Sequence, residues 1–204
     1  MAGIFITLEG IEGSGKSTQA RLLADWLQRQ GKEVVVLREP GSTAIGERIR
    51  DILLTKEFKE MIPITELFLF LASRAQLVEE KIRPQLQKGR CVILDRYIDS
   101  TIVYQGYGGG VDIGIIEKMN NIATGGLQPD ITFLLDIDIP EGLNKSGFKD
   151  RIEEKGVDFH TKVREGYFQL AEKYPERIFI VKVKSDPDST HKEIKKIFSH
   201  KFLI

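Results

Sequence analysis

The feature that most constrains this chain is a glycine-rich segment near its start. Residues Gly10–Ser17 (GIEGSGKS) fit the pattern G-x-x-x-x-G-K-[S/T], with an apolar run at 4–8 before it and apolar residues at helical spacing over about 16–30 after it. Glycines let backbone amides turn inward around phosphate groups, and the helix that follows points the positive end of its dipole at the same place. A strand, a phosphate loop and a helix in this order predict a nucleotide-binding α/β domain rather than an accidental glycine turn.

The rest of the chain alternates in the same way. Uniformly apolar runs predict further strands at 33–37, 91–94, 131–135 and 178–181, and helical patterns lie at 43–54, 64–86, 111–123 and 188–202. Strands without polar alternation are typical of a parallel sheet covered by helices on both faces, so we expect one α/β domain over residues 1–204. Within the long helix, Leu67–Leu71 is apolar all round and predicts burial on every side. We expect Gly106–Gly110 to be a loop.

Composition excludes several classes of protein. Thirty Lys and Arg balance thirty Asp and Glu, which argues against a broad nucleic-acid-binding surface. We find no apolar stretch long enough to cross a bilayer and no signal-peptide pattern, so we expect no membrane partner. With one cysteine, no disulfide can form within the chain, and the protein is predicted to be cytoplasmic.

Several residues at the loop and at strand ends are candidates for nucleotide chemistry. Lys16 can reach the β- and γ-phosphates, and the Ser17 hydroxyl can coordinate Mg²⁺. Asp95 ends an apolar strand, where an acidic residue can hold Mg²⁺ directly or through water, although a capping role is the alternative. Arg96 follows it and can contact phosphate. Glu12 is a second candidate near the metal, or else a solvated loop carboxylate.

Arginines near the predicted strand ends suggest that two phosphorylated substrates are brought together. A guanidinium neutralises phosphate with bidentate geometry, and the set consists of Arg38, Arg50, Arg74, Arg96 and Arg151. A guanine-reading N-K-x-D segment is absent, because residues 144–147 (NKSG) lack the Asp. The chain therefore looks more like a phosphotransferase than a GTPase.

At this point the chain resembles a known family, the thymidylate kinases. The resemblance rests on residues 10–18 (GIEGSGKST), 38–41 (REPG), 70–74 (FLASR), 95–97 (DRY) and 104–106 (YQG), in that order. It implies a P-loop fold with a five-stranded parallel sheet, a lid and a homodimer. It also implies transfer of the γ-phosphoryl group of ATP, with Mg²⁺, to dTMP. Another pyrimidine nucleoside monophosphate kinase and a P-loop nucleotide-binding switch protein remain as alternatives.

The resemblance also assigns the acceptor site. Phe70 and Arg74, four residues apart on one helix face, correspond to a ring that stacks on the base and a guanidinium that reads thymine O4, where cytosine presents a donor instead. The other residues implied for dTMP are Arg38, Arg50 and Arg96 for its phosphate, Tyr104 for the deoxyribose, and Ser100, Thr101 and Gln105 near the base. The loop residues implied for ATP are Gly10, Ile11, Glu12, Gly13, Ser14, Gly15, Lys16, Ser17 and Thr18.

The predicted lid covers about 144–154 and carries Lys145, Lys149 and Arg151. Because the phosphate loop has no arginine, we expect the lid to supply charge over the transferring phosphoryl group. Lys16, Arg96 and Arg151 are the predicted catalytic residues. The acceptor is itself a phosphate whose second pKa lies near 6, so the reaction requires no general base.

Overall fold

A computed structural model of the protein describes residues 3–145, 150–152 and 154–203. In that part, five strands form one parallel sheet in the order β2-β3-β1-β4-β5, which confirms the predicted sheet. The strands are β1 (Phe5–Glu9), β2 (Val34–Arg38), β3 (Cys91–Asp95), β4 (Ile131–Asp136) and β5 (Ile178–Lys182). Leu8 in β1 pairs with Asp95 on one side and Phe133 on the other. The carboxyl ends of these strands therefore meet at one edge of the sheet.

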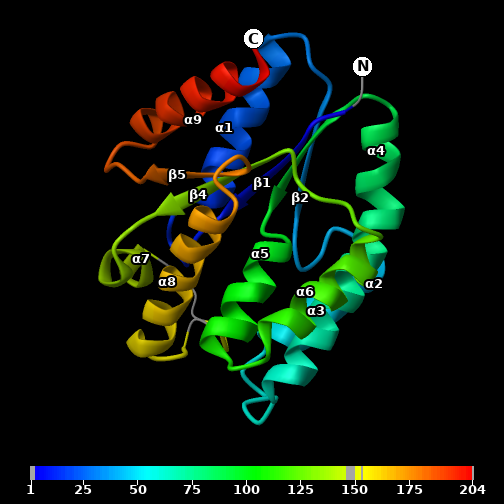
Figure 1. Cartoon of the computed structure of the whole chain (residues 1–204), viewed down its shortest axis with the longest axis vertical. Helices are drawn as coiled ribbons and strands as arrows, with labels where there is room; N and C mark the ends of the chain where they lie inside the picture. The colour runs from blue at the N-terminus through cyan, green and yellow to red at the C-terminus, as the bar shows by residue number, and fades with distance from the viewer. Residues whose placement is uncertain (1–2, 146–149, 153, 204) are drawn as a thin grey trace.

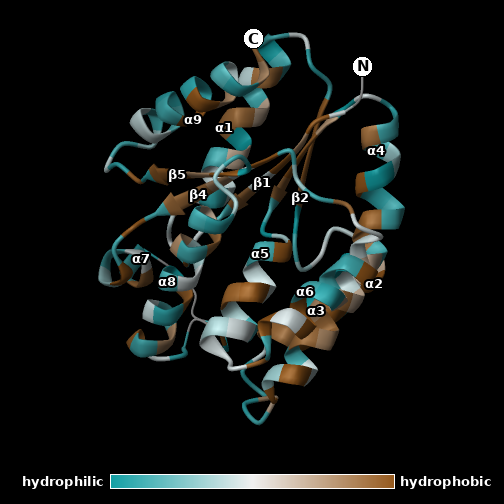
Figure 2. Cartoon of the chain, in the orientation of Figure 1, coloured by the Kyte–Doolittle hydropathy of each residue, from teal (hydrophilic) through white to brown (hydrophobic). Residues whose placement is uncertain are grey.

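Helices cover both faces of the sheet (Figure 1). Helices α1 (Lys16–Arg29) and α9 (Pro187–Phe202) pack together, and Leu23, Leu27 and Phe198 join strand side chains in one buried cluster. A second cluster fills the space under α3 (Pro63–Leu77), α6 (Ile113–Thr124) and α8 (Val157–Lys173). Figure 2 shows the central strands in brown between helices that are apolar on the inner side. Strands buried from both sides explain the uniformly apolar runs in the sequence.

The helix predicted over 64–86 is three consecutive helical stretches. α3 runs into a π-helical turn, η1 (Val78–Ile82), and then into α4 (Arg83–Gln87). Pro84 has no N–H to bond back into the preceding turn, which accounts for a widened turn at this point.

The prediction that Leu67–Leu71 is buried on every side is wrong. Leu67 and Leu71 are buried, but Phe68 is 55% exposed. α3 packs against α2 (Ala44–Leu54) and α6 and presents its remaining side to solvent. A run of apolar residues does not reveal which helix face has neighbours, so the exposed strip could not be read from composition.

The prediction of a glycine loop at 106–110 is also wrong for most of that segment. α5 (Ile98–Thr101) continues into a π-helical stretch, η2 (Ile102–Gly108), before the chain turns into α6. A side chain at Gly108 would collide with the Phe159 ring of α8. Glycine is needed here so that η2 can lie close to α8, and a loop is not required.

Helix α7 (Ile139–Lys145) leads into the predicted lid. Residues 146–149 and 153, which include Lys149, lie outside the described residues. Among the described helices, none combines the length and the apolar character needed to span a bilayer.

Candidate active site

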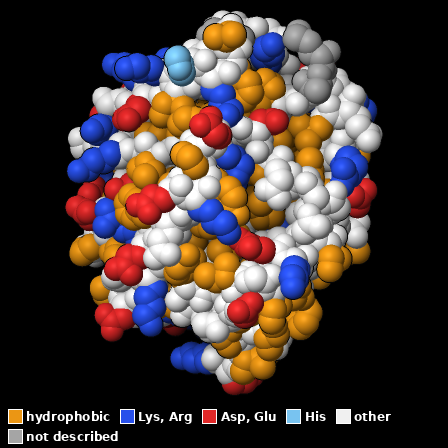
Figure 3. Space-filling model, viewed as in Figure 1, with side chains coloured by type: hydrophobic (Ala, Val, Ile, Leu, Met, Phe, Trp, Pro, Cys, Tyr) orange, Lys and Arg blue, Asp and Glu red, His pale blue; other side chains and the backbone are white. Residues whose placement is uncertain are grey.

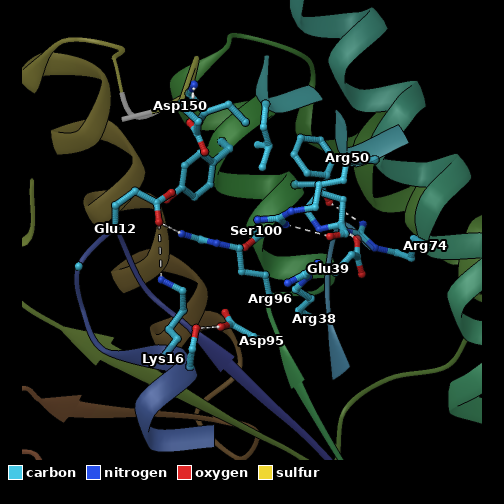
Figure 4. Close-up of a pocket in the computed structure, with 18 of the residues that line it drawn as sticks. Glu12, Lys16, Arg38, Glu39, Arg50, Arg74, Asp95, Arg96, Ser100 and Asp150 are labelled. Atoms are coloured by element: carbon cyan, nitrogen blue, oxygen red, sulfur yellow. Dashed lines mark hydrogen bonds and ion pairs between the residues drawn. The ribbon is translucent and has the colours of Figure 1, made fainter. Parts of the chain in front are cut away.

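A cavity of about 490 Å³ opens at the carboxyl ends of β1, β2 and β3 (Figure 4). It brings together most of the predicted site, so donor and acceptor candidates from separate parts of the sequence share one space. The predicted residues on its wall are Glu12, Gly13, Gly15, Lys16, Ser17, Thr18, Arg38, Arg50, Phe70, Arg74, Asp95, Arg96, Ser100, Thr101, Tyr104 and Gln105. Four predicted residues do not line it: Gly10, Ile11, Ser14 and Arg151.

The phosphate loop connects β1 to α1 as the sequence predicted. Lys16 is 7% exposed, and its ammonium group donates to the carbonyl oxygens of Ile11 (2.9 Å) and Gly10 (3.2 Å). Burial and the nearby Arg96 charge lower the pKa of Lys16. Gly13 faces the backbone of Gly142 in α7 so closely that any side chain there would collide with the Gly142 carbonyl oxygen. The helix that leads into the predicted lid is therefore in direct main-chain contact with the phosphate loop.

Ser17 and Asp95 meet at the start of α1 and the end of β3. The Ser17 hydroxyl donates to Asp95 Oδ2 at 2.6 Å. Two adjacent hard oxygen donors beside a phosphate loop fit Mg²⁺, which usually takes one or two protein ligands together with phosphate and water. No cluster of three or more His, Cys, Asp or Glu occurs among the described residues, so a cage built entirely from protein ligands is not found in that part of the chain.

Glu12 pairs with Arg96 across the cavity. Its carboxylate forms an ion pair with the Arg96 guanidinium, lies 3.8 Å from the Lys16 ammonium and accepts from the Tyr104 hydroxyl at 3.2 Å. Burial alone would raise the pKa of Glu12, but the Arg96 and Lys16 charges outweigh it and lower the pKa to about 2. Glu12 is thus a charged, mostly buried partner of Arg96 and not a solvated loop carboxylate.

Arg96 is held in an unusual backbone conformation at the end of β3. Its φ of 70° lies in the left-handed region, which side-chain-bearing residues rarely adopt. The guanidinium lies over the Tyr104 ring, with 5.0 Å between Cζ and the ring centroid, and contacts Ser100 Oγ at 3.3 Å. Surrounding contacts keep this strained residue aimed into the cavity, which is typical of functional sites.

Beneath Arg96 lies Glu9, the fully buried last residue of β1. One carboxylate oxygen accepts the Tyr97 backbone N–H (2.8 Å), and the other accepts the hydroxyls of Ser100 (2.6 Å) and Tyr167 (2.7 Å). Burial, and then the negative charge of Asp99, raise the pKa of Glu9 to about 7. Ser100, which was predicted to contact substrate, is therefore also a support for Glu9.

Arg74 is almost fully buried on the acceptor side, close to Phe70. It pairs with Glu39 at 2.5 Å, and Nη2 also donates to the Tyr97 carbonyl at 3.0 Å. Nη1 donates to Thr101 (2.9 Å) and Asn120 (2.5 Å). The buried Nε has no hydrogen-bond partner in the described part of the chain. The predicted base reader is therefore fixed by its neighbours, with one donor remaining.

Arg38 and Arg50 are the more accessible cations on this wall. Arg38 pairs with Glu47 at 2.9 Å, and its side chain is 56% exposed. Arg50 donates to the Pro40 carbonyl at 2.9 Å, and burial followed by the Arg38 charge lowers its pKa. With Arg96, they are the arginines lining the cavity to which the resemblance assigned a phosphate.

The lid residues divide between the cavity and the helices beside it. Lys145 lines the cavity and pairs with Glu141 at 2.7 Å. Arg151 is 8% exposed and pairs with Glu66 of α3 at 2.6 Å, so in this conformation its guanidinium is not on the cavity wall. A direct contact between Arg151 and a transferring phosphoryl group does not follow from this arrangement.

Sequence reasoning missed the carboxylates that hold the cations. Glu9 follows apolar strand residues, the signal that drew attention to Asp95, and Glu39 belongs to the quoted 38–41 motif. Asn120 and Glu66 lie on helices, and nothing in the sequence separates them from surface polar residues. Their role depends on packing between helices that are distant in sequence.

Comparisons with known proteins agree with this geometry. The family model for thymidylate kinase matches residues 8–194. The thymidylate kinase of Thermoanaerobacter sp. (strain X514) is 46% identical over 196 residues, which cover 95% of this chain and 96% of the relative. The thymidylate kinase of Caldanaerobacter subterraneus subsp. tengcongensis is 47% identical over 198 residues, covering 96% and 95%. The crystal structure of thymidylate kinase from Ehrlichia chaffeensis has a TM-score of 0.82 at 35% identity, covering 97% of this chain and 100% of the other.

Proposed function

Because the chain belongs to the thymidylate kinase family, and so is an ATP-dependent dTMP kinase of dTTP biosynthesis, we propose how its own residues carry out that reaction. The observation that carries the proposal is the single cavity shared by the phosphate loop and the buried Arg74. ATP binds with its phosphates in the loop at Gly13–Thr18, and dTMP binds on the opposite wall. The reaction then needs only an in-line approach of two phosphates.

On the donor side, the loop amides and Lys16 neutralise the β- and γ-phosphates. Ser17 and Asp95, 2.6 Å apart, would hold Mg²⁺, which supplies positive charge between the phosphates when bound. Lys16 already lies among carbonyl oxygens of the loop and needs only to exchange these acceptors for phosphate oxygens. The γ-phosphoryl group moves from ATP to a dTMP oxygen, giving ADP and dTDP.

On the acceptor side, Arg38, Arg50 and Arg96 bind the dTMP phosphate, and Tyr104 packs against the sugar. Phe70 stacks on the base, and Arg74, with Thr101 and Gln105 beside it, reads the base edge. Arginine donates and does not accept, so it favours the O4 acceptor of thymine over the N4 donor of cytosine. The ion pairs with Glu12 and Glu39 keep Arg96 and Arg74 oriented before substrate binds.

The test is a substrate panel. ADP and nucleoside diphosphate are measured with Mg-ATP and one acceptor at a time: dTMP, dUMP, UMP, dCMP, AMP or GMP. We expect dTMP to be phosphorylated most efficiently, dUMP less so, and dCMP hardly at all. Phosphorylation of dCMP at the dTMP rate would contradict the role of Arg74. A preference for UMP would favour the alternative pyrimidine kinase.

We further propose that the protein is a homodimer that associates through α2, α3 and α6. α2 packs against α3, and α3 packs against α6. All three helices expose large apolar side chains, and Figure 3 shows orange atoms gathered at the lower right, over this region. The exposed residues are Ile45, Ile52, Phe68, Ile115 and Ile122. An apolar strip of this kind suits a second copy of the same chain. Phe68→Glu should give a monomer by sedimentation velocity, whereas Ile180→Glu on the edge strand β5 should not.

A cytoplasmic location stays a prediction from the single cysteine and the lack of a signal-peptide pattern.

A further inference from the structure

One buried carboxylate connects the lid to the wall of the acceptor pocket. Glu66 of α3 is 1% exposed and accepts from three side chains. Arg151 Nη2, at the end of the predicted lid, lies at 2.6 Å, and Lys155 Nζ, directly after the lid and before α8, lies at 3.2 Å. Gln105 Nε2, from η2 on the cavity wall, lies at 2.7 Å. Three elements that are distant in the sequence therefore meet at a single side chain.

The same end of the lid has further attachments to these elements. Arg151 Nε donates to the Leu53 carbonyl at 3.1 Å. The Lys155 ammonium lies 4.6 Å from the centroid of the Phe159 ring, which in turn packs edge-on against Tyr104, 6.1 Å between centroids. Both Tyr104 and Gln105 line the cavity. This end of the lid is thus fastened to the two η2 residues predicted to contact the acceptor.

The charges explain why the arrangement is fixed. Burial would raise the pKa of Glu66, but Lys155, the Gln105 amide and Arg151 outweigh it and lower the pKa, so the carboxylate is ionised at neutral pH. A buried carboxylate is strongly destabilised when a cationic partner leaves. Arg151 is therefore committed to Glu66 and is poorly placed to move to a phosphate.

The Gln105 amide is oriented by the same carboxylate. Because its NH₂ group donates to Glu66, its carbonyl oxygen is the atom left to accept a hydrogen bond from a ligand. A displacement of the lid end that moved Glu66 would also move this acceptor.

We propose that Glu66 is a positioning residue that holds the Gln105 amide on the wall of the acceptor-base pocket, and that Arg151 acts on the reaction through Glu66. Glu66 touches neither substrate. It holds the chain at Arg151 and Lys155 and the Gln105 amide in one mutual orientation, so that this side of the acceptor pocket stays packed and excludes water. Without these contacts, water could enter and take the γ-phosphoryl group instead.

A double-mutant cycle tests this inference. The variants are Glu66→Gln, Arg151→Ala and the combination of both, and the measured quantities are kcat and KM for each substrate. If Arg151 acts through Glu66, each single change lowers kcat/KM for dTMP about tenfold, and the combination is no worse than the worse single variant. A loss of kcat/KM near a hundredfold in the double variant would mean that Arg151 acts on the reaction independently of Glu66, and it would overturn the proposal.

A second measurement separates positioning from simple loss of structure. ATP hydrolysed per dTDP formed should rise several-fold in Glu66→Gln, because the loosened pocket wall admits water to the γ-phosphoryl group. An unchanged ratio overturns the proposal, since a merely structural defect lowers both rates together.

The matched control is Lys56→Met. It removes an exposed ion pair between Lys56, in the α2–α3 connection, and the lid residue Glu154, which at 2.6 Å is as short as the Arg151–Glu66 pair. It should leave the ratio unchanged, and a rise equal to that of Glu66→Gln would overturn the proposal. Where Glu66→Gln does not fold, Lys155→Met keeps the Arg151 pair and removes the second cation. This variant should raise the same ratio, and a wild-type ratio would again overturn the proposal.

Discussion

The two walls of the active site hold phosphate groups by different means. The donor wall is a continuous loop whose backbone amides and one lysine are arranged by local chain geometry. The acceptor wall is assembled from β2, α2, α3, β3 and η2, and its arginines are held by carboxylates: Arg74 by Glu39, Arg96 by Glu12 and Arg38 by Glu47. Backbone geometry leaves no room for a side chain at Gly13 of the loop, whereas ion pairs let separate elements contribute to one precise site.

The largest effect should come from the donor wall. Lys16→Ala removes the side-chain cation that can reach the β- and γ-phosphates, and we expect kcat to fall about 10²–10³-fold, as for loss of one strong donor at a reacting anion. Steady-state kinetics at saturating dTMP would measure it, with circular dichroism as the control for folding. Undiminished turnover would contradict the assignment of the loop.

On the acceptor wall, Arg74→Ala should reduce kcat/KM for dTMP about 10–100-fold while ATP affinity changes little, because a charge-assisted hydrogen bond to the base is lost. It should also lower the free energy of unfolding by about 3–5 kcal/mol, since Glu39 is left buried and unpaired. The double variant Arg74→Ala/Glu39→Gln should regain stability and not dTMP activity. Equal losses for both substrates would remove the distinction between the walls.

Glu9 and Glu12 offer a contrast in pH dependence. The folded chain keeps Glu9 protonated up to about pH 7, although the ordinary value is 4.5. Between these values the unfolded chain has released a proton that the folded chain retains, so stability falls as the pH rises, by about 3 kcal/mol. Above pH 7 this loss is complete. The contribution of Glu12, whose pKa is about 2, has the opposite sign. The stability that its ionised form gives the protein is lost as the pH falls below about 4.5.

Urea unfolding at pH 4.5 and 8 tests the Glu9 contrast. Glu9→Gln cannot titrate, so its stability should lack the decline of the wild type over this range. Parallel stability profiles for the two proteins would show that Glu9 titrates at its ordinary pKa and is not shifted by its burial.

A smaller effect on activity is expected from Asp95, whose side-chain oxygens belong to the donor wall. Asp95→Asn keeps the shape but removes a charge beside Ser17, and we expect about 10-fold more Mg²⁺ for half-maximal activity. The measurement is a Mg²⁺ titration at fixed free ATP. Thr18→Ser, on the same helix turn, is a control that should leave the titration midpoint near that of the wild type.

The smallest effect should come from the exposed pair on the acceptor wall. Glu47→Gln releases Arg38, whose pair with Glu47 is solvent-screened, so stability should change by at most about 1 kcal/mol. KM for dTMP should change no more than a few-fold. A loss as large as that of Arg74→Ala would mean that exposure does not distinguish these pairs.

The donor wall could be predicted from the sequence because its residues are contiguous and its motif is set by backbone geometry. The parallel sheet followed from apolar strands alternating with helices. Phe70 and Arg74 were placed correctly on one helix facing the cavity because four residues separate them, and the family resemblance supplied their roles.

What could not be predicted depends on tertiary packing. Glu9, Glu39 and Glu66 are carboxylates whose importance comes from burial beside arginines, which a linear pattern does not encode. Gly108 was taken for a loop residue because close helix packing and chain reversal both select glycine. The pairing of Arg151 with Glu66 could not be seen from the sequence, because the two residues lie on distant segments.

The contact between Gly13 and Gly142 has a consequence for engineering this enzyme. α7, which leads into the predicted lid, meets the phosphate loop here with no room for even a methyl group at either glycine. A library that diversifies either position offers no graded adjustment, because alanine already forces the two segments apart. Adjusting the distance between α7 and the loop has to begin at other positions.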